Sequence, residues 1–188
     1  MKDTKVPVLG FAAFSGTGKT TLLTQLIPLL KNTGLRVGLI KHSHHNFEID
    51  KPEKDSYRLR KAGASPIMIV SSHRRATITE FAEVTEPKLV DQINALDSTD
   101  LDLILVEGFK TENFPKIELH RPSLKNKLLF PHDPSIIAIA ADENFTLTTD
   151  NTNLAEANLT SISQPPPLDI NNPKQIANFI LNDFLVLK

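Results

Sequence analysis

The segment around which this chain is expected to fold reads Ala13-Phe14-Ser15-Gly16-Thr17-Gly18-Lys19-Thr20-Thr21. An apolar run at 6–14 leads into it, and a helical pattern at 20–33 leads out of it. This strand–loop–helix order is the context that a phosphate-binding P-loop requires. Small residues let backbone N–H groups turn toward phosphate oxygens, and the helix points its positive N-terminal end at the same place. We therefore expect residues 15–21 to bind the phosphates of a nucleotide.

Two side chains of this segment are candidates for the chemistry. Lys19 can reach the β- and γ-phosphates, which makes it a candidate catalytic residue, and Thr20 can offer its hydroxyl to Mg²⁺. The general pattern G-x-x-x-x-G-K-[ST] has glycine where this chain has Ala13. Alanine is small enough for that place if its φ is negative. The competing interpretation is a Gly/Ser turn before an ordinary amphipathic helix.

Composition narrows the class of protein. The 188 residues suit a single domain at 1–188. Lys and Arg number 21 and Asp and Glu 22, so the net charge of −1 argues against a nucleic-acid or anionic-membrane partner. The lack of cysteine excludes disulfides and thiolate metal sites. The N-terminus lacks the apolar segment of a signal peptide, and no run approaches the ~18 apolar residues of a membrane span, so we expect a cytoplasmic protein.

Hydrophobic patterns alternate between strands and helices along the chain. We expect strands at 6–14, 36–40, 66–70, 75–81, 101–106, 116–120 and 136–140, and helices at 20–33, 55–61, 87–96 and 173–187. This order predicts an α/β, P-loop NTPase-like three-layer fold with a mostly parallel sheet, in which the first two strands form a parallel pair. The strands at 66–70 and 75–81 predict an antiparallel hairpin. The alternation in 116–120 predicts a half-exposed strand at or near a sheet edge, with Lys116, Glu118 and His120 facing outward.

A P-loop nucleotidase needs a second acidic group, usually at the end of a buried strand. The strand at 101–106 ends in Glu107-Gly108, so Glu107 is a candidate Mg²⁺ ligand and catalytic residue. Gly108 would allow the backbone to approach phosphate closely. Asp102 competes for this role, but it lies at the opposite end of the strand from the sites that strand carboxyl ends build. The alternative for Glu107 is a carboxylate in solvent.

Two further places have candidate side chains. Lys41 and His42 follow the second strand, where they can touch phosphate or a substrate; the alternatives are a solvated polar loop, or a transition-metal site that adds His44 and His45. Asp142 follows the strand at 136–140, and a carboxylate there can accept from guanine N1–H and N2–H₂ together. Its alternative role is to start a turn.

Several motifs taken together resemble the MobB family of bacterial molybdopterin-guanine dinucleotide biosynthesis adapter proteins. They are the P-loop segment at 12–22, Leu39-Ile40-Lys41-His42-Ser43-His44-His45, Asp50-Lys51-Pro52, Lys54-Asp55-Ser56-Tyr57, Leu59-Arg60-Lys61-Ala62-Gly63-Ala64 and Leu101-Asp102-Leu103-Ile104-Leu105-Val106-Glu107-Gly108-Phe109-Lys110. The resemblance extends over residues 8 to 142 or so, and alanine also occupies the place of Ala13 in that family.

The resemblance implies a GTP-binding protein with weak GTPase activity. It also implies a homodimer whose sheets join, and a partner, the molybdenum cofactor guanylyltransferase that attaches GMP to molybdopterin. The strand at 116–120 or the hairpin would supply the joining edge. Slow hydrolysis agrees with the lack of an obvious glutamine to position water or an assured arginine finger.

Two other functions fit the same P-loop. A small-molecule kinase would place its acceptor near His42 and Asp55, with Arg58 and Arg60 closing on the phosphates. A metal-trafficking GTPase would use the histidines at 42, 44 and 45 as metal ligands.

Overall fold

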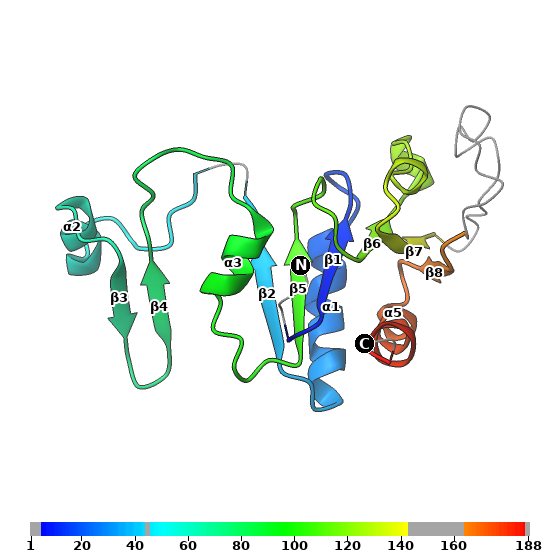
Figure 1. The fold of residues 1–188 in the computed structure, drawn as a ribbon, viewed down its shortest axis with the longest axis horizontal. Helices are drawn as coiled ribbons and strands as arrows, with labels where there is room; N and C mark the ends of the chain where they lie inside the picture. Colours follow the sequence, from blue (N-terminus) through cyan, green and yellow to red (C-terminus); the bar gives the residue numbers. More distant parts are fainter. Residues whose placement is uncertain (1–4, 44–45, 143–163, 187–188) are drawn as a thin grey trace. The chain divides into compact units, whose positions relative to one another are not determined.

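The computed structural model of the chain describes residues 5–43, 46–142 and 164–186. Their contacts form two compact units, one made of Met1–His42 and Lys88–Lys188 and the other of Ser43–Pro87 (Figure 1). In the described ranges, no helix is both long and apolar enough to cross a membrane. The first unit contains the P-loop segment and the main sheet, so the candidate site is built there.

The main sheet has six strands in the order β2-β5-β1-β6-β7-β8, and every neighbouring pair is parallel. This confirms the α/β class with a mostly parallel sheet. The strands are β1 (Val8–Ala12), β2 (Val37–Lys41), β5 (Leu103–Glu107), β6 (Lys116–Leu119), β7 (Ile136–Ala141) and β8 (Pro167–Asp169).

The expected pairing of the first two strands is wrong, because β5 lies between them. Val8 of β1 is in register with Ile104 of β5, and Val37 of β2 is in register with Leu103 of β5. A crossover helix makes the two strands it joins parallel, but it leaves room for a third strand between them. The run at 103–106 is fully buried, and an interior position covers both of its apolar faces.

The prediction for 116–120 is also wrong. Strand β6 lies inside the sheet between β1 and β7, and Lys116, Glu118 and His120 are all buried. The segment after β6 covers them: Glu118 accepts the backbone N–H groups of Leu129 and Phe130 at 2.7 and 2.8 Å. The alternating polar residues therefore face other polar groups of the protein. The alternating pattern alone does not show whether such residues bond to the protein or to water.

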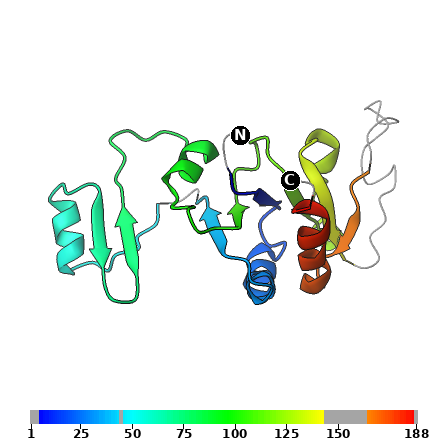
Figure 2. The same ribbon diagram turned by 60° about the horizontal axis from the view of Figure 1, so that its bottom comes forward.

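Helices cover both faces of the sheet (Figure 2). Helix α1 (Lys19–Asn32) lies on one face together with α5 (Pro173–Phe179), which continues as a π-helical turn, Ile180–Phe184. Helix α3 (Leu89–Ala95) packs on the other face against Val8, Ile104 and Val106. The predicted apolar face of α1 is confirmed, since its buried residues are Leu22, Leu23, Leu26 and Leu30. Pro28 is tolerated inside this helix.

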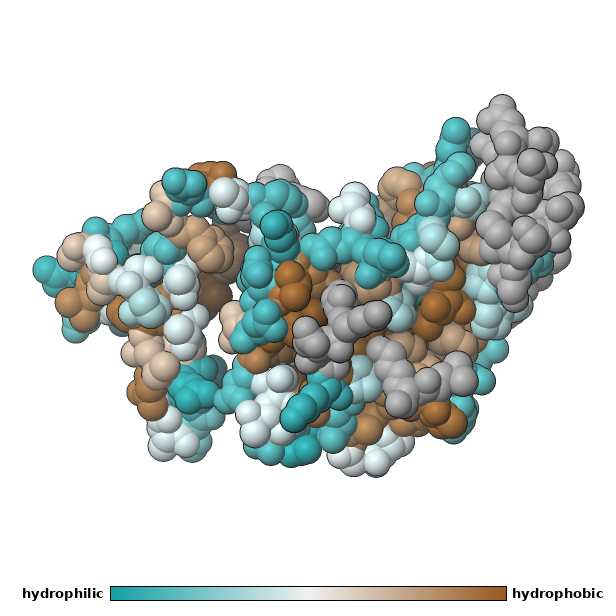
Figure 3. Space-filling view, in the orientation of Figure 1, coloured by the Kyte–Doolittle hydropathy of each residue, from teal (hydrophilic) through white to brown (hydrophobic). Residues whose placement is uncertain are grey.

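The Ser43–Pro87 unit holds helix α2 (Asp55–Lys61) and the predicted hairpin, β3 (Ile67–Val70) paired antiparallel with β4 (Arg75–Ile78). Among the described residues of this unit, the one buried charged residue is Arg60, which pairs with Glu48 and Glu80. The unit leaves much apolar surface exposed, visible as brown atoms in Figure 3. The exposed large apolar residues are Phe47, Ile49, Leu59, Met68, Ile69, Val70, Phe81 and Val84.

Candidate functional site

The P-loop segment connects β1 directly to α1. Gly16 and Gly18 have φ of +80° and +98°, a region that residues with a Cβ rarely adopt. The Thr17 hydroxyl donates to the carbonyl of Phe14 at 2.8 Å and closes the loop, and the N–H of Leu22 donates to the carbonyl of Gly18 at 2.9 Å as α1 begins. A tight loop with left-handed glycines ahead of a helix N-terminus forms a concave backbone site for anions.

Ala13 meets the condition expected for an alanine in this place, a negative φ. Positive φ among described non-glycine residues occurs at Glu53, Phe109 and Lys125, so Ala13 has a negative φ. Its side chain is buried and belongs to the core on the α1 face of the sheet. The condition for replacing the first glycine of the general pattern is therefore met.

Lys19 is the first residue of α1, and more positive than negative groups act on its ammonium group. Burial lowers the pKa of its ammonium group; Glu107 opposes this, whereas Lys110 and Lys41 lower the pKa further. The carboxylate of Glu107 already pairs with Lys41, Oε2 to Nζ 3.1 Å. The pairing follows from the sheet, because Lys41 and Glu107 are register partners at the ends of β2 and β5. The charges that act on Lys19 are thus one carboxylate and two further ammonium groups, a net positive charge that attracts a polyanion.

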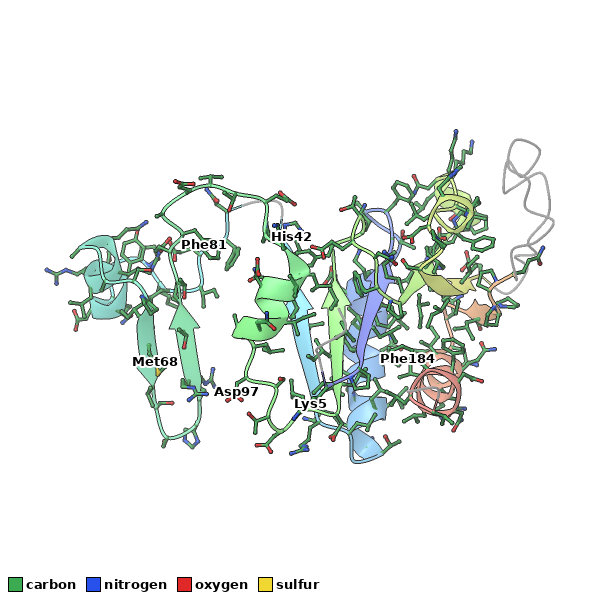
Figure 4. All side chains as sticks on the ribbon, viewed as in Figure 1. Lys5, His42, Met68, Phe81, Asp97 and Phe184 are labelled. Atoms are coloured by element: carbon green, nitrogen blue, oxygen red, sulfur yellow. The ribbon has the colours of Figure 1, made fainter. Side chains whose placement is uncertain are left out.

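The turn after β5 is packed tightly against the end of β2. The N–H of His42 donates to the carbonyl of Glu107 at 2.8 Å, and the His42 ring stacks on Phe109 with 4.7 Å between centroids. Figure 4 labels His42 at this end of β2. Gly108 has φ of +106°, and a Cβ there would lie 2.6 Å from the Cβ of His42. Gly108 therefore permits a close approach to His42.

Asp142 belongs to a polar group on the other side of β1. Arg121, which follows β6, donates from Nε to the carbonyl of Thr17 at 3.0 Å, from Nη1 to Asp142 at 2.5 Å and from Nη2 to Asn171 at 3.0 Å. Asn171 also donates to Asp142 at 3.2 Å. Arg121 thus ties the P-loop to the ends of β7 and β8.

A pocket of about 140 Å³ lies beside this group. Its lining residues are Gly18, Thr21, Leu22, Gln25, Arg121, Ile170, Asn171 and Pro173. The sequence pointed to Asp142 but missed Arg121 and Asn171, since neither belongs to a motif and Arg121 is 104 positions from its P-loop partner. The strand order is the signal that would have found them, because it brings the ends of β6, β7 and β8 beside the P-loop.

The remaining candidates are placed as follows. Ser15, Gly16 and Thr20 are exposed on the loop and the first turn of α1. Asp102 lies at the opposite end of β5, where it accepts from the backbone N–H of Arg36 at 2.8 Å. His44 and His45 lie outside the described residues, and the described part of the chain holds no group of three metal-binding side chains.

Of the residues invoked for a kinase, His42 belongs to the first unit, whereas Asp55, Arg58 and Arg60 belong to the Ser43–Pro87 unit. There, Arg60 is committed to Glu48 and Glu80, and Arg58 approaches Asp55 at 4.0 Å.

Comparison with known proteins decides the family. The profile described as "Molybdopterin guanine dinucleotide synthesis protein B", or MobB, matches residues 8–142. The chain belongs to the MobB family. The matched range begins with β1 and ends at Asp142, so it includes the P-loop, Glu107 and the turn that follows.

Two adapter proteins and one solved structure show how far the likeness to MobB extends. The molybdopterin-guanine dinucleotide biosynthesis adapter protein of Escherichia coli (strain K12) is 43% identical over 95% of this chain and 93% of its own length. The adapter protein of the same name from Haemophilus influenzae is 41% identical over 96% of this chain and 90% of its own. The crystal structure of Bacillus subtilis MobB has the same fold, with a TM-score of 0.67 at 21% identity over 93% of this chain and 96% of that one.

Proposed function

We propose that this MobB-family chain is a GTP-binding adapter protein with weak GTPase activity, which acts in molybdopterin-guanine dinucleotide biosynthesis. The adapter role is supported by relatives of that name along nearly the whole chain. The observation that carries nucleotide binding is the charge arrangement at Lys19, where a left-handed glycine loop meets three ammonium groups and one carboxylate.

The strand order sets the direction of the nucleotide in this proposal. The pocket beside Arg121 and Asn171 lies on the β6–β8 side of β1, and the cluster of Lys19, Glu107 and Lys41 lies toward β5 and β2. A base in the pocket therefore leaves the terminal phosphates at the lysine cluster. Asp142 stands at the base end, held by Arg121 and Asn171, where a carboxylate can accept from guanine N1–H and N2–H₂.

The side-chain oxygens near the P-loop are of the kind that binds Mg²⁺. Thr20 supplies a hydroxyl oxygen and Glu107 a carboxylate, and Mg²⁺ prefers a few protein oxygens together with phosphate and water. When bound, Mg²⁺ neutralises charge on the β- and γ-phosphates. Glu107 would have to share its carboxylate with Lys41, which pairs with it at 3.1 Å. Lys19 and the loop backbone bind and orient the phosphates.

Slow hydrolysis is supported by the contacts of three of the glutamines and of Arg121. Gln25 lines the base pocket, Gln92 donates to the carbonyl of Lys88 and Gln175 accepts from the backbone of Asp169. None of these three is positioned by those contacts to orient a water at the terminal phosphate. Arg121 is held at the base end. Among these four described residues, hydrolysis, in which water attacks the γ-phosphorus and GDP leaves, therefore finds no group of the kind that is worth about 10³–10⁵ in rate.

Homodimer formation and the cytoplasmic location are part of the same proposal. The hairpin of β3 and β4 is a sheet of two strands, and such a ribbon is marginal in water without further strands or packing. Its exposed Met68, Ile69 and Val70 and its open edges suit pairing with a second copy of the chain. The guanylyltransferase is the proposed partner of the assembled adapter.

The test is nucleotide binding by the purified protein with Mg²⁺, measured by isothermal titration calorimetry. We expect GTP to bind at least ~10-fold more tightly than ATP, and Lys19→Ala to weaken GTP binding by ~10-fold or more. Lys31→Ala, which removes the same charge from the last turn of α1, is the control and should bind as the unaltered protein does. Equal affinity for GTP and ATP would refute the guanine assignment.

The base assignment has a sharper test. Asp142→Asn exchanges a carboxylate oxygen for an amide N–H donor. We expect the variant to lose affinity for GTP and to gain affinity for xanthosine triphosphate, whose base has a carbonyl in place of the 2-amino group. If the nucleotide preference is unchanged, Asp142 does not read the base.

A further inference from the structure

We propose that Lys110 binds the terminal phosphate of the nucleotide, and that the buried Lys116 is a positioning residue that holds the segment carrying Lys110. Neither residue was among the site residues expected from the sequence. The inference rests on the proposed nucleotide site and names the group that distinguishes a triphosphate from a diphosphate there.

Lys110 lies at the terminal-phosphate end of that site. It follows β5, which lies on the opposite side of β1 from the β6–β8 strands beside the base pocket. Its Nζ lies 5.2 Å from the ring centroid of Phe14, the second residue of the P-loop segment. Its charge also acts on Lys19, whose pKa it lowers. Lys110 is therefore an exposed cation beside the first residues of the loop, and its charge acts at Lys19.

The backbone around Lys110 is held from inside the sheet. Lys116 is 1% exposed, and its Nζ donates to the carbonyl of Lys110 at 3.1 Å and to the carbonyl of Glu112 at 2.5 Å. The same Nζ pairs with Asp133 at 2.9 Å. A buried ammonium is costly unless it is fully hydrogen-bonded and paired. Here its partners are the turn that carries Lys110 and a carboxylate from the segment after β6.

The neighbouring strand makes room for this buried lysine. A Cβ on Gly10 of β1 would lie 2.7 Å from Cγ of Lys116 and 2.6 Å from the ring of Phe114. The absence of a side chain at Gly10 lets the Lys116 side chain pass close to β1 at this position, with its Nζ 5.0 Å from the Phe114 ring centroid. A glycine inside a strand often marks such a close approach.

These contacts assign different tasks to the two lysines. Lys116 is committed to two carbonyls and Asp133, so it acts through the backbone it holds. The Lys110 side chain is exposed, and its ammonium is available to a phosphate. A cation that touches the terminal phosphate favours GTP over GDP, because GDP lacks that group.

The test compares GTP and GDP affinities, with Mg²⁺, for the full chain and its variants by calorimetry. We expect Lys110→Ala to weaken GTP binding by ~10-fold or more and GDP binding by less than ~3-fold. Lys31→Ala removes an equal charge at the far end of α1 and should change neither affinity. If Lys110→Ala weakens both nucleotides equally, or neither, the inference about Lys110 is wrong.

The role of Lys116 is tested in the same assay. Lys116→Met should lower the preference for GTP over GDP, with GDP affinity kept. Since this change leaves Asp133 without its cation, the double variant Lys116→Met/Asp133→Leu removes both charges together, a replacement that buried pairs often tolerate. A double variant that folds, as judged by circular dichroism, and keeps the full preference for GTP would overturn the positioning role.

The outcomes separate this inference from the proposed function. If the unaltered protein binds no GTP, or if Lys19→Ala binds GTP as tightly as the unaltered protein does, both the proposed function and this inference are overturned. Lys19-dependent GTP binding with an unaltered preference in Lys110→Ala overturns only the inference drawn here.

Discussion

Replacement of Gly108 by alanine tests the packing between the ends of β5 and β2. Gly108 has φ of +106°, and an added Cβ would lie 2.6 Å from the Cβ of His42 and 3.4 Å from its Cα and N. The left-handed backbone costs a residue with a Cβ about 1–2 kcal/mol. Overpacking against a neighbour that cannot move costs roughly 1–3 kcal/mol more. We expect Gly108→Ala to lower the free energy of unfolding by about 2–5 kcal/mol.

The assay is urea unfolding followed by circular dichroism, with Gly34→Ala as the matched control. Gly34 also has a left-handed backbone, φ +92°, but an added Cβ would meet no atom within 4 Å. Gly34→Ala should therefore show only the backbone cost, about 1–2 kcal/mol. Equal losses for the two variants would refute the close contact with His42.

A double-mutant cycle identifies the atom responsible. His42→Ala keeps the Cβ, so it should leave the cost of Gly108→Ala unchanged. His42→Gly removes the Cβ and should recover part of that cost, as a coupling free energy between the two positions. If His42→Ala and His42→Gly recover equally, the clash does not involve the His42 Cβ.

Two further predictions concern a buried carboxyl and the hairpin. Burial raises the pKa of Glu118 to about 7, so the folded state holds its proton more tightly than the unfolded state does, and stability should fall as the pH rises from about 4 through 7. Relative to Glu118→Gln, the unaltered protein should lose roughly 3 kcal/mol of unfolding free energy between pH 4 and pH 8 in urea titrations; a difference that does not change with pH would contradict the burial effect. Val70→Asp, at an exposed hairpin position, should convert a dimer into a 20.9 kDa monomer in light scattering, whereas Val186→Asp should remain dimeric. Monomeric unaltered protein would rule out the dimer.

The P-loop was predictable because the information for it is local. Gly16, Gly18 and Lys19 are neighbours in the chain, and the apolar runs around them already indicate a strand and a helix. The condition on Ala13 is likewise a property of one residue's φ. The same holds for the hairpin and for the apolar face of α1, both of which the structure confirms.

Strand β6 shows where such reasoning fails. The alternation of Lys116, Glu118 and His120 is the same whether the polar face meets water or meets other polar groups. Their actual partners include Asp133 and the backbone at 129 and 130. Since that covering segment has no strong period of its own, its position could not be read from the pattern.

The amino-acid sequence was sufficient for the class of fold, the parallel direction of the strands joined by α1 and the position of the glycine-rich loop between β1 and α1. Hydrophobic period and turn chemistry decide these features over a few neighbouring residues. Only the tertiary structure decided that β5 separates β1 from β2, that Arg121 joins the P-loop to Asp142, and that Lys110 lies over the ring of Phe14. These arrangements depend on which apolar faces are buried together, and residues far apart in the chain meet only when that choice has been made.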